Sequence, residues 1–335
     1  MTILILQLRR LGDVLMTTPM LRAIKGAMPG ARVEVCVEPA SAPAIRNNPH
    51  ADALLVAEPG SFLRTAASLR RRRYDVVIDT LGTPGSALLA FCSSAPTRIG
   101  RRRPWRELFY THALPPGAGS RYSAAEKLEL LEPLGIRSAD CRIELFPTDA
   151  ERREVDRFWS ALPVPSEQAV VALSPVSRRP EKVWPAERFA EVCDRWAVRA
   201  GCVFLPVFAP GEELLVERVI RQLRRRDSVI WPGPRLSFGA LVPLMQRCAL
   251  YFGNDNGARH AAVAAGIPTA AVFGMADPIS WTPPESTCHF HVGGGRPIDS
   301  VPADAVDKML ARALAACGSG ARPSVRGQRE PGQSL

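Results

Sequence analysis

The stretch ALYFGNDNGARHAAVAAGIPTAAVF, residues 249–273, holds two short apolar runs separated by small and polar residues. The runs at 249–252 and 269–273 predict buried strands, and the alanine-rich segment between them predicts a helix that begins near Asn256. Two strands joined through a helix are typical of a parallel sheet. The first strand ends at Gly253, so polar residues and the unpaired backbone N–H groups of a helix start follow it directly. The stretch therefore predicts an α/β fold with an anion-binding loop at a strand end.

The same alternation of strands and helices extends outward over most of the chain. In the second half we expect further strands at 170–174, 202–207 and 229–231 and helices at 186–200, 212–225 and 238–247. In the first half we expect strands at 3–8, 33–37, 53–56 and 75–79 and a helix at 12–28. An amphipathic helix and a proline-rich linker, between 146 and 168, separate the halves. The sequence thus predicts two doubly wound, Rossmann-like parallel-sheet domains, residues 1–160 and 168–317, that face a central cleft. The tail 318–335 has almost no apolar residues, and we expect it to be disordered.

The composition is that of a globular protein and excludes a chain that is disordered throughout. The 335 residues are 46% hydrophobic and 23% charged, which provides apolar material for two cores. Lysine and arginine number 43 against 33 for aspartate and glutamate, a net charge of +10. Such an excess favours anionic partners: a nucleotide, a phosphorylated glycan, nucleic acid or an anionic membrane surface.

The cysteines and the apolar segments indicate in which cellular compartment the protein is expected. The 8 cysteines are scattered without a Cys-x-x-Cys pair, which favours reduced thiols over a disulfide framework. The apolar run Ile3–Leu6 is too short for a signal peptide, and no stretch approaches the roughly 20 apolar residues of a membrane-spanning helix. We therefore expect a cytoplasmic protein, and its positive charge is compatible with peripheral contact at the inner face of the cytoplasmic membrane.

Open parallel sheets bind ligands at the carboxyl ends of their strands, so the strand-end loops are the candidate sites. After the first strand, Gly12 permits a tight turn and Asp13 falls in the first helical turn. This carboxylate either complements the helix dipole or acts as a general base in the cleft. The loop from Ser174 onward is either a solvated charged loop or a diphosphate clamp, with positive charge from Lys182 and a donor from Ser177.

The loop at 253–260 is the most informative of these. Asp255, Asn256 and Gly257 lie at the expected helix start, and His260 lies one turn further, where it can face the same ligand. A lone histidine is more often structural, but these neighbours favour a functional role. Neither a Gly-x-Gly-x-x-Gly motif nor a P-loop sequence is present. His289 and His291 lack a third ligand, so we interpret them as structural and expect no metal site.

Two arginine clusters accompany the first half. We interpret Arg70–Arg73 as a solvated helix face. The second cluster is interleaved with Trp105 and Tyr110, an arrangement suited to a phosphorylated glycan, anionic lipid headgroups or RNA. Its members are Arg98, Arg101, Arg102, Arg103 and Arg106.

Four segments together resemble the family 9 glycosyltransferases, the lipopolysaccharide heptosyltransferase group. They lie at 8–39, 74–100, 181–192 and 251–278, so the resemblance runs through nearly all of the chain before the tail. The segment GNDNGARH, residues 253–260, is similar to the Gly-Asn-Asp-Ser/Thr-Gly…His signature of the family. The order and spacing of the segments identify the chain as a member.

The resemblance implies a GT-B fold with the acceptor in the first domain, the nucleotide-sugar in the second and a terminal helix that packs back across. It implies inverting, metal-independent sugar transfer without a cofactor, from ADP-heptose to a lipopolysaccharide core or a related glycan. Asp13 matches the general base, and Lys182 matches the cation beside the departing diphosphate. For the donor we assign Ser174, Ser177, Lys182, Asp255, Asn256, Gly257 and His260. For the acceptor we assign Arg9, Arg10, Gly12, Arg101 and Arg103.

Departures from the family pattern leave the sugar open. Asn256 stands where Ser or Thr is usual, Ala258–Arg259 replaces a Pro-Met pair, and Arg9–Arg10 replaces small hydroxyl residues. The added cations are compatible with a phosphorylated acceptor and equally with a different substrate. The alternatives are a GT-B transferase for another nucleotide-sugar, a nucleotide-sugar epimerase and, remotely, a nucleic-acid-binding protein. The last would leave Asp13 and Lys182 unexplained.

Overall fold

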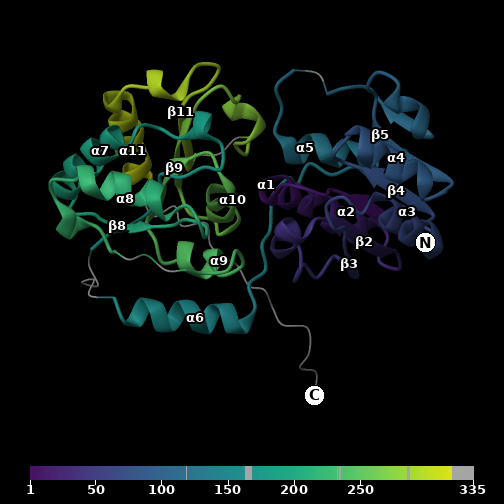
Figure 1. The fold of residues 1–335 in the computed structure, drawn as a ribbon, viewed down its shortest axis with the longest axis horizontal. Helices are drawn as coiled ribbons and strands as arrows, with labels where there is room; N and C mark the ends of the chain where they lie inside the picture. The colour runs from purple at the N-terminus through teal and green to yellow at the C-terminus, as the bar shows by residue number, and fades with distance from the viewer. Residues whose placement is uncertain (118, 163–167, 232, 234, 285–286, 319–335) are drawn as a thin grey trace.

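The computed structural model describes residues 1–117, 119–162, 168–231, 233, 235–284 and 287–318. They form two α/β domains that lie side by side, each built on a parallel sheet (Figure 1). This confirms the predicted fold class. The tail predicted to be disordered lies, from residue 319 on, outside the described residues. No helix within the described part of the chain is long and apolar enough to cross a membrane.

The first domain carries a sheet with strand order β3-β2-β1-β4-β5-β6. Its strands are β1 (Thr2–Leu6), β2 (Arg32–Val37), β3 (Ala53–Val56), β4 (Val76–Asp79), β5 (Thr97–Arg101) and β6 (His112–Leu114). Its helices are α1 (Leu11–Leu15), α2 (Thr18–Ala27), α3 (Phe62–Arg72), α4 (Pro84–Cys92) and α5 (Ser123–Leu128). Alternate residues of β1 point to opposite faces: Ile3 packs with α1 and α2, and Leu4 packs with α3 and α4. Both faces are therefore covered, as an all-parallel sheet requires.

The second domain repeats this plan with strand order β11-β10-β9-β7-β8. Its strands are β7 (Val170–Ser174), β8 (Val203–Pro206), β9 (Leu250–Asn254), β10 (Thr269–Phe273) and β11 (His289–Gly293). Its helices are α7 (Ala186–Arg199), α8 (Glu213–Gln222), α9 (Leu241–Met245), α10 (Gly257–Ala264) and α11 (Ala303–Gly318). In β7, Ala172 belongs to the core beneath α9 and α10, and Leu173 belongs to the core beneath α7, α8 and α11.

The structure differs from the sequence expectations at several elements. The helix expected at 12–28 is split into α1 and α2, because the hydroxyls of Thr17 and Thr18 bind the carbonyls of Val14 and Leu15 at 2.6 and 2.8 Å. The strand expected at 229–231 is reduced to a bridge between Phe204 and Val229. Strands β5 and β6 were not anticipated.

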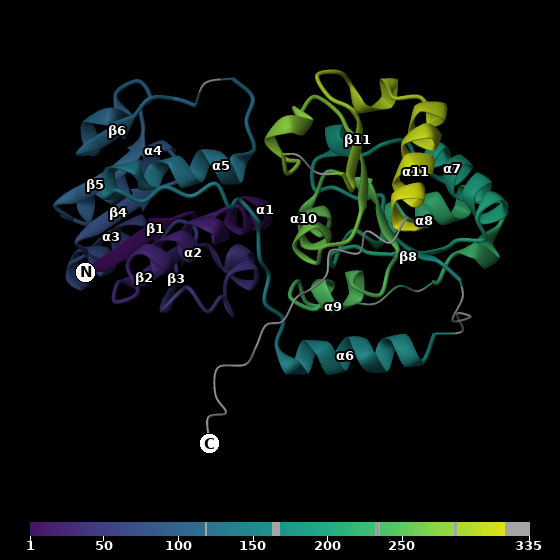
Figure 2. The same cartoon turned by 180° about the vertical axis from the view of Figure 1, so that it is seen from behind.

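The helices near the domain boundary also depart from expectation. The terminal helix α11 does not cross back to the first domain within the described residues, because its buried side chains pack against β10, β11 and α7. Helix α6 (Asp149–Ser160) instead runs alongside α9 of the second domain (Figure 2). There Arg247 forms an ion pair with Asp156 and its guanidinium lies 6.0 Å from the Trp159 ring centroid. The predicted boundary at residue 160 stays a prediction.

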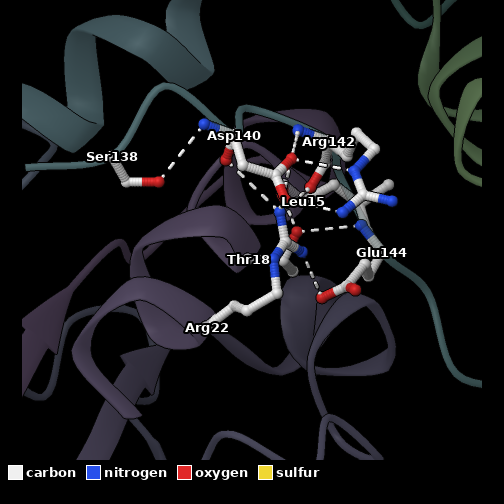
Figure 3. A network of polar contacts seen from close by, with 7 residues as sticks. All are labelled: Leu15, Thr18, Arg22, Ser138, Asp140, Arg142 and Glu144. Atoms are coloured by element: carbon white, nitrogen blue, oxygen red, sulfur yellow. Dashed lines mark hydrogen bonds and ion pairs between the residues drawn. The ribbon is translucent and has the colours of Figure 1, made fainter. Parts of the chain in front are cut away.

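The segment that leads from the first domain to α6 is fixed to α2 by charge (Figure 3). The Arg22 guanidinium lies 3.1 Å from the carboxylate of Asp140 and 2.6 Å from that of Glu144. The backbone N–H of Glu144 donates to the Thr18 hydroxyl at 2.9 Å. A hydrogen bond from Arg142, with the nearby charge of Arg22, lowers the pKa of Asp140 to about 2. The connecting segment is thus part of the first domain up to this point.

Candidate functional site

The loop between β9 and α10 is shaped by close packing against the end of β7. A Cβ atom at Gly253 would collide with the Ser174 carbonyl, so glycine permits this approach. Asn256 caps α10, because its Oδ1 accepts a hydrogen bond from the backbone N–H of Arg259 at 3.2 Å. Its Nδ2 donates to the Ser174 hydroxyl at 3.0 Å and to the Val176 carbonyl at 2.9 Å. The Asn256 side chain therefore joins two strand-end loops into one rigid surface.

Asp255 is the centre of a buried charge cluster at this surface. Its carboxylate lies 2.8 Å from Lys182 Nζ, 3.6 Å from Arg259 and 3.9 Å from His260 Nε2. Arg259 is fully buried and donates further to the Trp281 carbonyl at 2.9 Å and the Thr282 hydroxyl at 2.8 Å. The structure thus brings together Lys182, Asp255 and His260, which the sequence assigned to one donor site.

The cluster carries more positive than negative charge. Burial acts to raise the pKa of Asp255, but His260, Arg259 and Lys182 outweigh it and lower that pKa overall. Burial lowers the pKa of His260 to about 4, so its imidazole is neutral at neutral pH. One carboxylate therefore faces the basic side chains of both Lys182 and Arg259. Lys182, whose side chain is 24% exposed, is the cation that an anionic ligand can reach.

The two domains meet at this cluster through the start of α1. A Cβ atom at Gly12 would lie 2.6 Å from His260 Cδ2, so the backbone of α1 rests on the imidazole. Asp13, the next residue, is half-buried in the first turn of α1. Asp13 and the Asp255 cluster therefore lie on facing sides of one domain contact.

The loop before α1 is held by a buried lysine that the sequence analysis did not single out. Gln7 Nε2 donates to the Arg9 carbonyl at 2.6 Å, and Gln7 Oε1 accepts from Lys127 Nζ at 2.9 Å and from the Thr80 hydroxyl at 2.6 Å. Burial lowers the pKa of Lys127, while the charges of Asp13 and Asp79 oppose that shift. A glutamine at the end of an apolar strand was the available sequence signal, because such a side chain needs a partner when buried.

Some of the remaining predicted site residues are held by hydrogen bonds or ion pairs within the protein, and others have exposed or half-buried side chains. Ser174 is fully buried and its hydroxyl donates to the Val207 carbonyl at 2.8 Å. Arg101 binds Glu129 and donates to the carbonyls of Pro115 and Glu126 at 2.9 and 2.7 Å, so its guanidinium joins β5 to the α5 region. By contrast Arg9, Arg10 and Arg103 are exposed and Ser177 is half-buried. The predicted ligand roles of these residues stay predictions.

The two C-terminal histidines lie on β11, and neither has an ion pair or hydrogen bond with Asp255 among the contacts of the described residues. His289 Nδ1 is 3.2 Å from the Thr269 hydroxyl, and burial lowers the pKa of His289 to about 3. His291 packs edge-on against the Phe273 ring. Across the described ranges, no group of three His, Cys, Asp or Glu side chains is placed to hold a metal ion.

Comparisons with known proteins bear on the family and the fold. The sequence model "Glycosyltransferase family 9 (heptosyltransferase)" matches residues 62–293. Lipopolysaccharide heptosyltransferase 3 of Escherichia coli strain K12 is 28% identical over 293 residues, which cover 81% of this chain and 82% of the relative.

Two solved structures share the whole architecture. A family 9 glycosyl transferase from Veillonella parvula DSM 2008 superimposes with a TM-score of 0.79 at 22% identity, over 94% of this chain and 97% of that one. The ADP-heptose LPS heptosyltransferase II of E. coli superimposes with a TM-score of 0.76 at 20% identity, over 94% of this chain and 99% of that one. These likenesses establish the GT-B fold. The family model matches more than half of the chain, so the chain belongs to glycosyltransferase family 9, the heptosyltransferase family, and is a glycosyltransferase.

Proposed function

We propose that this glycosyltransferase moves heptose from ADP-heptose onto a lipopolysaccharide core or a related glycan, with inversion and without a metal ion. The observation that carries the proposal is the cluster at Asp255, where Lys182 is a partly exposed cation in a site with excess positive charge. The relatives support the substrates: one is a lipopolysaccharide heptosyltransferase, and a protein of similar structure is an ADP-heptose LPS heptosyltransferase.

The proposed reaction is a single displacement at the anomeric carbon of the donor sugar. The acceptor hydroxyl gives its proton to Asp13 while its oxygen forms the new bond to that carbon. The bond from the carbon to the diphosphate breaks, and its electron pair leaves with the phosphate oxygen. Lys182 offsets the negative charge that grows on this oxygen. The first domain binds the acceptor and the second binds the nucleotide-sugar, so that base and leaving group lie on opposite sides of the sugar.

The proposal places the enzyme in the cytoplasm, in peripheral contact with the anionic inner face of the membrane. The donor is soluble, whereas the acceptor is a glycolipid. The net charge of +10 supports attraction to such a surface. Asn256 and Gly257 shape the donor loop, and Arg9, Arg10 and Arg103 are the exposed cations offered to an acidic acceptor.

The test compares Asp13→Asn, Lys182→Met and Asp149→Asn. Transfer from ADP-heptose is followed by mass spectrometry, and ADP, UDP and GDP binding by calorimetry, each with and without EDTA. We expect Asp13→Asn to lower kcat by about 10²-fold or more and to leave ADP affinity unchanged. Lys182→Met should weaken ADP binding as well as kcat.

The control variant, Asp149→Asn, shows whether Asp13 acts as a general base or only complements the dipole of its helix. Asp149, which is exposed, lies in the first turn of α6, and Asp13 lies in the first turn of α1. Asp149→Asn therefore also removes an acid that complements a helix dipole, and it should leave kcat unchanged. Equal kcat in Asp13→Asn and Asp149→Asn would remove Asp13 from the mechanism. Tighter binding of UDP or GDP than of ADP would overturn the donor assignment.

A further inference from the structure

Exposed apolar side chains gather on one surface of the first domain. Among the described residues, Leu63 of α3 is 82% exposed, Phe91 of α4 50%, Trp105 52% and Leu108 78%. Leu88, one turn before Phe91 on α4, is 36% exposed. We call this set the apolar surface. Large hydrophobic side chains so exposed and so close together mark an interaction site.

Ring contacts join two members of the surface, Phe91 and Trp105, through a third ring. The Phe109 ring, in the short helical turn Arg106–Phe109, lies 5.5 Å from the Phe91 ring and 6.2 Å from the Trp105 ring. Between α3 and α4 a cavity of about 730 Å³ opens, lined by Ala66, Arg70, Phe91 and Arg98 among others. These elements lie on the side of the first domain that faces away from the second domain (Figure 1).

Arginines with unneutralised charge surround the apolar side chains. The Arg98 guanidinium lies 5.7 Å from the Phe91 ring centroid, and that of Arg106 lies 5.3 Å from the Trp105 centroid. Arg98 donates to the Ala95 and Phe109 carbonyls and Arg106 to the Gly82 carbonyl, all of them uncharged. Within the described ranges, Arg70, Arg98 and Arg106 have no ion pair with a carboxylate.

The apolar surface adjoins the sheet edge that carries the proposed acceptor site. Arg106 donates to the carbonyl of Gly82 at 2.9 Å, and Gly82 follows directly after β4. Strand β4 pairs with β1, whose carboxyl end leads to Asp13. Arg106 therefore links the apolar surface to the carboxyl end of a strand that neighbours β1.

We propose that the apolar surface docks on an anionic lipid bilayer. Trp105, Leu108 and Phe91 insert among the headgroups and upper acyl chains, and Arg70, Arg98 and Arg106 bind headgroup phosphates. The combination of tryptophan, leucine and uncompensated arginine matches the two attractions of an interfacial anchor, apolar burial and charge. The biological meaning rests on the proposed function, in which the acceptor is a glycolipid, but the binding itself needs no catalysis.

The experiment is co-sedimentation of the full chain with phosphatidylcholine vesicles, with or without phosphatidylglycerol. Trp105→Ser with Leu108→Ser should lower binding to the anionic vesicles by about tenfold or more. Arg70→Gln should lower it about fivefold. The matched apolar control is Val198→Ser with Leu214→Ser, since these side chains of the second domain are 69% and 65% exposed. The matched charge control is Arg152→Gln, an exposed residue of α6.

Two results would overturn the proposal. One is binding to anionic vesicles that is reduced equally by the surface variants and by their controls. The other is a chain that is dimeric in solution, becomes monomeric in the Trp105→Ser, Leu108→Ser variant and still binds vesicles in that variant. The apolar surface would then join two copies of the chain.

Activity measurements separate this proposal from the catalytic one. The Trp105→Ser, Leu108→Ser variant should keep kcat/KM on a lipid-free acceptor and lose it on an acceptor embedded in vesicles. A chain that transfers no heptose but sediments as expected contradicts the proposed function alone. A chain that transfers heptose but fails the sedimentation pattern contradicts the docking surface alone.

Discussion

Replacement of Asp255 by asparagine tests whether charge holds the loop between β9 and α10. The variant removes the carboxylate that faces both Lys182 and Arg259. Lys182 is 24% exposed and can turn into solvent, whereas Arg259 is fully buried and keeps only the neutral acceptors of Trp281 and Thr282. The cost of the substitution therefore comes from an uncompensated guanidinium.

The expected loss is about 3 kcal/mol in the free energy of unfolding. Removal of one partner from a buried ion pair typically costs about 3–5 kcal/mol. We expect the lower end, because the 3.6 Å separation between Arg259 and Asp255 is long and two hydrogen bonds of Arg259 remain. Arg259→Met added to Asp255→Asn should recover most of this loss, since methionine can fill the space that Arg259 occupies against the Phe273 ring.

The assay is urea unfolding followed by tryptophan fluorescence, with Asp156→Asn as control. Asp156 is 56% exposed in its ion pair with Arg247, so its loss should cost less than about 1 kcal/mol. Equal losses in Asp255→Asn and Asp156→Asn would refute the reasoning. So would a double variant no more stable than Asp255→Asn, because the buried charge would then not be the cause.

Three further predictions concern the contact between the domains. Gly12→Ala should lower the free energy of unfolding by about 1–3 kcal/mol, because the new Cβ atom collides with His260. Gly26→Ala, where the added Cβ atom meets open space, should not lower it, and urea unfolding of the two variants measures the difference. The pKa of His260 is about 4 in the folded chain and about 6.5 in the unfolded chain, so the stability present above about pH 6.5 is lost as the pH falls toward 4. His260→Gln should remove up to about 1.4 kcal/mol per pH unit of this dependence, whereas His112→Gln, at an exposed residue, should leave it unchanged; unfolding measured between pH 7 and 5 tests both. Lys127→Met should lower kcat about tenfold with little change in the unfolding midpoint, because Gln7 loses the lysine that holds it in place and binds the Arg9 carbonyl, just before Asp13, less firmly. An unchanged kcat would contradict this role of Lys127.

The sequence was sufficient to predict those features of the fold and the site that depend on residues close together along the chain. The apolar runs at 170–174 and 249–252 and the glycine after the latter marked strand ends, and the cluster of Asp255 with Lys182 followed from their places at those ends. The break between α1 and α2 had a local signal too, the pair Thr17–Thr18 before a proline. Its weight was misjudged, because the hydroxyl bonds that end α1 compete with an otherwise good helix pattern.

The sequence was insufficient where a partner lies far along the chain. Arg101 was a plausible ligand for an acidic acceptor, but it is engaged by Glu129, and nothing near Arg101 indicated that pairing. Lys127 contacts a glutamine at position 7, and only the folded sheet places them together. Arg259 stood out as a departure from the family pattern, yet its complete burial depends on carbonyl and hydroxyl partners at Trp281 and Thr282.

The way in which the connecting segment is fixed determines how the cleft can open. Arg22 holds the chain as far as Glu144, and the Asn47 amide donates to the carbonyl of Phe146 at 3.2 Å. Helix α6, capped by Thr148, already packs on the second domain. The backbone between these two anchorages is therefore a hinge of very few residues around Pro147. A rotation about this hinge would move the second domain as a rigid body and separate His260 from Gly12 without unfolding either sheet.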